Sequence, residues 1–171
     1  MNIKRLVILT GTALLGLSLV LLWLSSNSDT SLRMAHAASP WYVAPGGIDS
    51  NSCMSSAASC ATINGAIGKA SSGDTVYVAK GTYIGNGDVV LLLNKSVTLS
   101  GGWDDTFTTQ SGTSTIDGEG TRRGITVNSG VAAIVERFVV QNGWSDWVVG
   151  DGGGISNSGT LTLNSSTAVG S

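Results

Sequence analysis

The chain has 171 residues, only 12% of them charged, and a formal net charge of −2. A weakly charged, slightly acidic chain lacks the basic surface that nucleic-acid binding requires, so we expect no nucleic-acid partner. Its 24 glycines are typical of a flexible chain, but short apolar segments recur throughout the sequence and indicate a folded, strand-rich protein.

Residues 1–37 predict either a signal peptide or an N-terminal membrane anchor. Two basic residues precede the uncharged segment 6–24, which as a helix would be about 28 Å long, close to the thickness of a bilayer core. Residues 35–38 read Ala-His-Ala-Ala and match the form of a signal-peptidase site. We therefore expect a secreted or cell-surface protein that begins near Ala38. Without cleavage, residues 6–24 would hold it in the membrane.

Export limits the chemistry of the mature chain. His36, the only histidine, lies at the expected cleavage site, so histidine acid–base catalysis and histidine metal ligands are excluded from the mature protein. Cys53 and Cys60 are the only cysteines, and in an oxidising compartment such a pair indicates a disulfide; two unpaired thiols are the alternative. Zinc is not expected, because its sites need further Cys or His ligands.

Residues 38–72 are expected to form an N-terminal strand, the disulfide loop and a cap helix. The strand is predicted at residues 41–43. In residues 61–70, apolar side chains recur with the spacing of one helical face. We expect this face to cover an open edge of the strands that follow. The apolar side chains are Ile63, Ala66, Ile67 and Ala70.

Residues 73–171 change to short apolar segments separated by turns that are rich in Gly, Asn and Asp, which is the pattern of β-strands. Within them, GITVNSG at 124–130 is repeated as GISNSG at 154–159. A repeat of about 30 residues indicates stacked units. The predicted strands are residues 75–79, 82–84, 89–93, 96–101, 115–117, 124–127 and 132–142.

The segments are too short for a helical repeat, and a propeller blade would need about 40 residues and four strands. We therefore predict an all-β fold, a right-handed parallel β-helix (a solenoid) with a short N-terminal cap helix and with its coils in residues 73–171. The side chains expected to point inward are Ile125, Val127, Val135, Leu161 and Leu163.

The segment 152–171 begins a coil and stops soon after its second strand, without a cap residue. We therefore expect the chain to be the N-terminal part of a longer repeat protein. Its C-terminal strand edge would then be open, and an open edge favours self-association.

Two segments resemble known families. CATINGAIGKASSGDTVYVAKGTY, residues 60–83, resembles the N-terminal cap and first coil of secreted right-handed parallel β-helix proteins of the pectate-lyase-like superfamily. GGGISNSGTLTLNSS, residues 152–166, is similar to the Gly-Gly-x-Ile coils of surface proteins related to the polymorphic outer-membrane adhesins. The Phe-x-x-Asn tetrapeptide of those adhesins is missing, because FVVQN at 138–142 has one residue more. The resemblance implies a fold rather than an activity, since the superfamily contains lyases, hydrolases, adhesins and inert stalks.

The most charged stretch, IDGEGTRR, contains Asp117, Glu119 and Arg122. It resembles part of the site of β-helix polysaccharide lyases, in which acidic residues hold Ca²⁺ and a basic residue abstracts a proton. The alternative is a corner, because Asp-Gly and Glu-Gly form turns and the opposite charges neutralise each other in solvent.

Three tryptophans mark two further candidate sites. Asp104 and Asp105 follow Trp103, and adjacent carboxylates are suitable ligands for Ca²⁺, although a loop whose Trp covers a corner gives the same pattern. Trp144 and Trp147 lie three residues apart in a loop and suit the recognition of sugars or proteins; packing over a sheet is the alternative.

These features favour an exported, non-catalytic protein that acts in adhesion, in glycan or protein binding, or as a structural stalk. The alternative is a carbohydrate-active enzyme, a polysaccharide lyase or hydrolase, or a truncated remnant of one. The expected partners are polysaccharides or surface proteins. No cofactor is expected, and Ca²⁺ is the one metal for which the sequence offers ligands.

Overall fold

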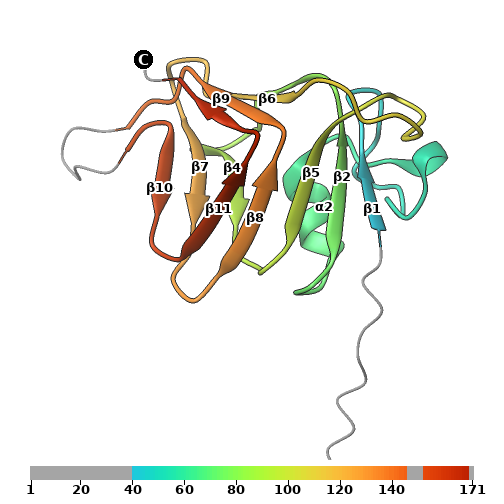
Figure 1. The fold of residues 1–171 in the computed structure, drawn as a ribbon, viewed down its shortest axis with the longest axis horizontal. Helices are drawn as coiled ribbons and strands as arrows, with labels where there is room; N and C mark the ends of the chain where they lie inside the picture. The colour runs from blue at the N-terminus through green and yellow to red at the C-terminus, as the bar shows by residue number, and fades with distance from the viewer. Residues whose placement is uncertain (1–39, 146–151, 170–171) are drawn as a thin grey trace, which may run out of the picture. The chain divides into compact units, whose positions relative to one another are not determined.

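A computed structural model describes residues 40–145 and 152–169 (Figure 1). The first part of the chain forms β1 (Pro40–Val43), the 3₁₀ helix η1 (Ser56–Ala58), α2 (Ile63–Lys69), β2 (Thr75–Ala79), β3 (Thr82–Tyr83), β4 (Val89–Leu93) and β5 (Thr98–Trp103). The second part forms β6 (Ser114–Asp117), β7 (Arg123–Val127), β8 (Ala132–Glu136), β9 (Phe138–Gln141), β10 (Ile155–Asn157), β11 (Thr160–Asn164) and β12 (Thr167–Ala168).

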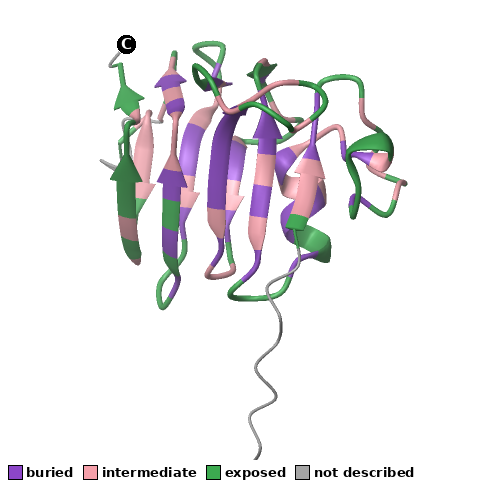
Figure 2. Ribbon diagram, turned by 45° about the vertical axis from the view of Figure 1, so that its right-hand side comes forward, coloured by how far each residue is buried: buried purple, intermediate pink, exposed green. Residues whose placement is uncertain are grey.

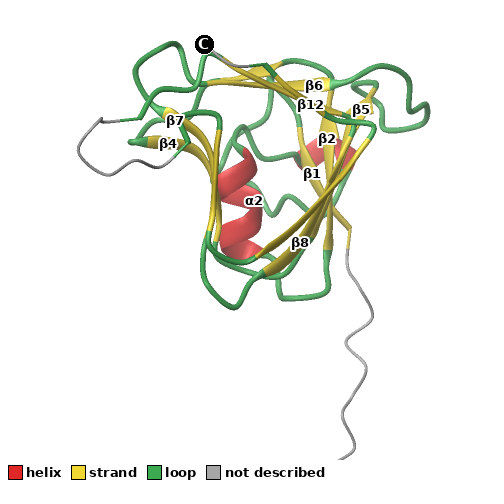
Figure 3. Cartoon of the chain, turned by 60° about the vertical axis from the view of Figure 1, so that its left-hand side comes forward, coloured by secondary structure: helices red, strands yellow, loops and turns green. Residues whose placement is uncertain are grey.

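The strands lie in three sheets, and all neighbouring strands within them are parallel. The five-stranded sheet has the order β1-β2-β5-β8-β11, the four-stranded sheet β12-β9-β6-β3, and the three-stranded sheet β10-β7-β4. The sheets are arranged around a common interior (Figure 3). Consecutive strands in the chain mostly belong to different sheets, as parallel pairing requires a crossover between neighbours.

The fold class predicted from the sequence is wrong. The strands form three separate parallel sheets, so the chain is mostly sheet but is not the right-handed β-helix solenoid that we expected. The reason lies in the strand spacing, because register partners are 23 residues apart for Thr75 and Thr98 but 36 apart for Thr98 and Ile134. The spacing of 30 residues between the repeats at 124 and 154 therefore does not apply to the other strand pairs.

The two copies of that repeat do lie side by side. β10 pairs with β7 in parallel, and Ile155 is the register partner of Ile125. Ile125 is fully buried, and Ile155 packs against the core in part. The sequence repeat thus marks two neighbouring strands of one sheet.

The core is a single hydrophobic cluster with side chains from all three sheets and from α2. Buried residues alternate with half-buried residues along most of β2 and with exposed residues along β8, as expected for one buried face (Figure 2). Ile125, Val127 and Val135 are buried as predicted, whereas Leu161 is only partly buried and Leu163 is 41% exposed. The two leucines pair with the buried residues Ala133 and Val135, so they lie on the core face of the last described strand of the sheet.

The helix predicted at residues 61–70 is confirmed as α2, and it contacts β1, β2 and β4. Its N-terminus is capped by the side chain of Thr62, which accepts a hydrogen bond from Gly65 N. At its C-terminus the Lys95 ammonium group donates to three backbone carbonyls at 2.7–2.9 Å. A cation at this end also interacts favourably with the helix dipole. The three carbonyls belong to Ile67, Gly68 and Ala70.

The predicted signal or anchor in residues 1–37 lies outside the described residues. Within residues 40–145 and 152–169, no helix has the length and hydrophobicity needed to cross a membrane.

Candidate functional site

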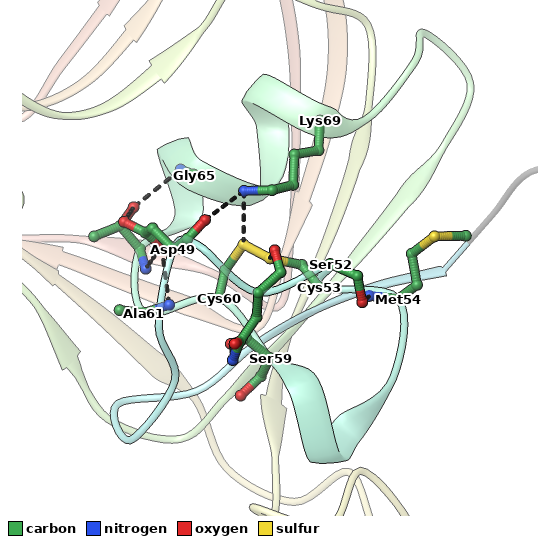
Figure 4. Close-up of a disulfide and its surroundings, with 11 residues drawn as sticks. Asp49, Ser52, Cys53, Met54, Ser59, Cys60, Ala61, Gly65 and Lys69 are labelled. Atoms are coloured by element: carbon green, nitrogen blue, oxygen red, sulfur yellow. Dashed lines mark hydrogen bonds between the residues drawn. A yellow bond between two sulfur atoms is a disulfide. The ribbon is translucent and has the colours of Figure 1, made fainter.

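The predicted disulfide between Cys53 and Cys60 is present, and both cysteines are fully buried (Figure 4). The loop that it closes lies beside β1, because Tyr42 N donates to Cys53 O and Cys60 N donates to Tyr42 O, each at 2.8 Å. Lys69 of α2 donates to the backbone carbonyl of Asp49 at 2.6 Å and so ties the helix to this region. A disulfide is compatible with an extracellular location.

The outer face of the five-stranded sheet carries a row of side chains that spans all five strands. Val76, Leu99 and Val135 are buried in the core, so the residues that follow them in sequence point to the opposite face. The register of the strands places these outward side chains side by side. In strand order the row is Tyr42, Tyr77, Ser100, Glu136 and Asn164.

Four half-buried aromatic rings make continuous contacts at one end of this row. The ring centroids of Tyr42 and Tyr77 are 5.7 Å apart, and those of Tyr77 and Trp103 are 5.0 Å apart. Phe107, from the loop after β5, packs edge-on against Tyr42 at 5.0 Å. We call Tyr42, Tyr77, Trp103 and Phe107 the aromatic face. Such contacts stabilise aromatic pairs beyond the burial of their area.

A polar cluster of Ser100, Gln110 and Glu136 lies next to the aromatic face. The hydroxyl of Ser100 donates to Glu136 Oε1 at 2.5 Å and accepts from Trp103 Nε1 at 3.1 Å and from Gln110 Nε2 at 2.9 Å. Ser100 is therefore fixed in orientation and is only 4% exposed. Among the described residues no donor reaches Oε2 of Glu136, so this oxygen can accept a hydrogen bond from a ligand.

Asp104 organises the loop that presents Phe107. Its carboxylate accepts hydrogen bonds from the backbone N–H groups of Thr106, Thr108 and Thr109 and from two threonine hydroxyls, at 2.9–3.2 Å. These bonds, with the Thr108 backbone first, lower the pKa of Asp104 from 3.8 to about 2. Both carboxylate oxygens thus accept hydrogen bonds from residues of the loop. The described part of the chain shows no group of three or more potential metal-ligating side chains around Asp104, Asp105 or elsewhere.

The loop is expected to loosen in acid. The pKa of Asp104 is lower in the folded chain, so its contribution to stability is complete above about pH 4 and is lost as the pH falls toward 2. NMR titration of the Thr108 and Thr109 amide signals should show a transition near pH 2. Asp104→Asn should abolish that transition, whereas Asp105→Asn should leave it in place. A midpoint near pH 4 in the unmodified chain would contradict this account.

Asp117 lies at the end of β6 and holds a corner. It accepts hydrogen bonds from Gln141 Nε2 at 2.9 Å, from the Glu119 backbone at 2.9 Å and from Asn142 Nδ2 at 3.0 Å. The hydrogen bond from Gln141, followed by the other two, lowers the pKa of Asp117. The carboxylate therefore links β6 to β9, which is the role of a turn residue.

Arg122 has a comparable role. Its guanidinium group donates to the backbone carbonyls of Ile84 and Gly85, both at 2.8 Å, and forms an ion pair with Glu119 at 3.4 Å. Arg122 and Glu119 thus lie close together, as an ion pair. The hydrogen bonds of the arginine, however, stabilise the β3–β4 loop.

Trp144 is 46% exposed, and its backbone N–H donates to Arg122 O at 2.9 Å. Trp147 lies outside the described residues, so the predicted role of the two tryptophans in recognition stays a prediction. Trp144 alone offers one exposed ring rather than a contiguous surface.

A shallow cleft of about 330 Å³ lies between α2 and the β3–β4 loop. The side chain of Asn64, which lines it, donates to Val90 O and accepts from Leu92 N, both at 3.0 Å. The side-chain amide of Asn64 is thus hydrogen-bonded to the backbone of β4. Asn86 and Asn94 also line the cleft, but unlike the aromatic face it is lined by no aromatic ring.

Sequence reasoning identified Trp103 and Asp104 but missed most of the aromatic face and the polar cluster. The alternating pattern of WYV and TVYVA does place Tyr42 and Tyr77 opposite buried valines. That pattern does not say which strands are neighbours, and the contact between the two rings depends on their register. The missed residues are Tyr42, Tyr77, Ser100, Phe107, Gln110 and Glu136.

Comparison of this chain with protein-family models, curated proteins and solved structures finds no match. Function is therefore inferred from the geometry and chemistry of the site.

Proposed function

We propose that this chain acts outside the cell as a non-catalytic binding protein whose ligand is a glycan. The observation that carries the proposal is the aromatic face, whose four partly exposed rings adjoin the fixed polar cluster. Aromatic rings pack against the apolar C–H face of a sugar, and Oε2 of Glu136 can accept a hydrogen bond from a sugar hydroxyl.

The polar cluster favours neutral sugars over acidic ones. Glu136 is the charged member of the row that crosses the five strands, and a carboxylate there repels the carboxylates of uronate polymers. A neutral glycan instead donates its hydroxyl protons to this acceptor. We therefore expect neutral oligosaccharides to bind more tightly than pectin or alginate fragments.

A non-catalytic role is supported by the structural hydrogen bonds that the charged candidate residues make. Asp104, Asp117 and Arg122 each make several hydrogen bonds that hold their own corner or a neighbouring loop. Groups engaged in this way are not directed toward a common substrate position. The disulfide between Cys53 and Cys60 supports a location outside the cell.

The proposal is tested by glycan-array screening of the exported protein, followed by calorimetry with the best neutral oligosaccharide. Tyr77→Ala and Trp103→Ala should each weaken binding at least about tenfold, which corresponds to about 1.4 kcal/mol. Trp144→Ala, which removes an exposed Trp outside the aromatic face, is the matched control and should bind normally. Circular dichroism checks that each variant is folded.

Three outcomes would contradict this account. Uronate polymers that bind better than every neutral glycan would overturn the preference for neutral sugars. An equal loss of affinity in Trp144→Ala and Trp103→Ala would show that the aromatic face is not the site. Turnover of pectin or alginate to unsaturated products that disappears in Asp117→Ala or Arg122→Ala would show a lyase instead.

A further inference from the structure

A second row of outward-facing side chains lies beside the row that begins with Tyr42. Thr75 pairs in register with Thr98, and Thr98 pairs with Ile134. Each of these three residues directly precedes a buried core residue, so its side chain points to the outer face of the five-stranded sheet. Thr75 and Thr98 are half-buried, and Ile134 is 39% exposed. We call Thr75, Thr98 and Ile134 the second row, and the row that begins with Tyr42 the first row.

The hydroxyl groups of the second row are available to a ligand. Within residues 40–145 and 152–169, neither Thr75 Oγ1 nor Thr98 Oγ1 makes a hydrogen bond to another group of the chain. A hydroxyl group both donates and accepts, so each of the two can bind a hydroxyl group of a sugar. Ser100 of the first row differs, because its hydroxyl already has three hydrogen-bond partners. The second row therefore adds sugar-binding groups that the aromatic face lacks.

The loop after β5 borders the first row on the side opposite to the second row. This loop follows the C-terminal end of β5, whereas the residues of the second row precede those of the first row along the strands. Phe107 of the loop contacts Tyr42 of β1. Gln110 Nε2 of the same loop donates to Ser100 Oγ of β5 and lies 3.5 Å from Glu136 Oε1 of β8. The surface between the loop and the second row therefore extends across the strands, from β1 to β8.

The rings of the aromatic face do not form a flat platform. The interplanar angle is 65° between Tyr42 and Tyr77, 82° between Tyr42 and Phe107, and 50° between Tyr77 and Trp103. A ring packs face-on against a flat crystalline surface only when the two planes are parallel, and rings inclined at these angles cannot all be parallel to one surface. The rings instead suit a single glycan chain, whose sugars can turn relative to one another.

We infer that the ligand is a soluble, extended chain of neutral sugars that lies across the strands, between the loop and the second row. This inference rests on the proposed function and specifies its ligand. Neighbouring strands are about 4.8 Å apart, close to the length of one sugar residue in an extended chain, and the three spacings from β1 to β8 span about 14 Å. At least three consecutive sugars therefore bind. The aromatic face holds one end of the bound segment, Thr75 and Thr98 bond its middle, and Oε2 of Glu136 accepts from its other end.

Calorimetry on protein produced from the full chain tests the inference with oligosaccharides of increasing length. The probes are β-1,4-linked glucose, mannose and xylose oligosaccharides, each from the disaccharide to the hexasaccharide. In the series that binds best, the affinity should rise at least about tenfold from the disaccharide to the tetrasaccharide and stay constant beyond the pentasaccharide. Crystalline cellulose should leave the protein in the supernatant, because the inclined rings cannot pack on a flat surface.

Three variants locate the parts of the bound chain. Glu136→Gln replaces the acceptor Oε2 by a donor and should weaken the tetrasaccharide about tenfold, while the disaccharide, held at the aromatic face, should bind normally. Thr98→Val keeps the shape of the side chain but removes its hydroxyl, and should weaken the tetrasaccharide about threefold. The matched control is Thr126→Val, a half-buried strand threonine in the three-stranded sheet, which should bind every length normally.

The outcomes separate this inference from the proposed function. A disaccharide that binds as tightly as the tetrasaccharide, or an equal effect of Glu136→Gln on both lengths, would overturn the inference and leave glycan binding in place. Adsorption to crystalline cellulose that is lost in Trp103→Ala would likewise replace the single chain by a flat surface as the ligand. If no neutral oligosaccharide of any length binds, the proposed function fails and the inference fails with it.

Discussion

Replacing Phe138 by Ala is expected to lower the free energy of unfolding by about 3–5 kcal/mol. Phe138 is the largest of the fully buried side chains that the structure describes, and it lies at the start of β9 in the four-stranded sheet. Its ring packs closely under β5, where a side chain on Gly101 would approach the ring to 2.9 Å. The neighbouring backbone therefore closes around the ring, and truncation leaves a cavity.

Urea unfolding followed by circular dichroism measures the effect. Phe107→Ala is the matched control, because the same atoms are removed from a half-buried ring on the aromatic face. We expect its cost to be less than half that of Phe138→Ala. Equal losses for the two variants would mean that Phe138 is not the centre of a closely packed region.

Replacing both Cys53 and Cys60 by Ala is expected to lower the free energy of unfolding by about 2–3 kcal/mol, because the disulfide restricts the unfolded chain. The loop is short, with the cysteines 7 residues apart, which keeps the expected loss at the lower end of the usual range. The variant should also loosen the loop that covers the outer edge of β1 through Tyr42.

The same urea experiment provides an internal control. A reductant should lower the unfolding midpoint of the native protein by an amount similar to that caused by the double substitution, and it should leave the double variant unchanged. Identical midpoints for the oxidised protein and the double variant would show that the bond contributes nothing to stability.

The local elements were largely predictable from the sequence. The periodicity of 61–70 predicted α2, and the apolar segments at 75–79 and 89–93 coincide with β2 and β4. Residues 132–142 were predicted as one strand, but Arg137 has a φ of 59° and divides them into β8 and β9, which lie in different sheets. A left-handed arginine carries no sequence signal, because glycine and asparagine are the residues that usually adopt this conformation.

The fold class and the site depended on long-range pairing, which the sequence pattern does not reveal. One clear repeat, at 124 and 154, suggested a uniform solenoid, whereas the strands lie in three separate sheets with unequal spacing. Likewise, the contact between Tyr42 and Tyr77 joins residues 35 positions apart through the register of β1 and β2. Local periodicity fixes which face a side chain occupies but not its neighbours on that face.

The spacing of strand partners also governs the order in which the chain can fold. Every pair of neighbouring strands joins residues between 23 and 36 positions apart. Closing loops of similar, moderate length costs a similar amount of entropy at each step, and no strand waits for a distant partner. A chain that is synthesised from its N-terminal end can therefore add its strands in the order in which they emerge, starting from the covered edge of β1.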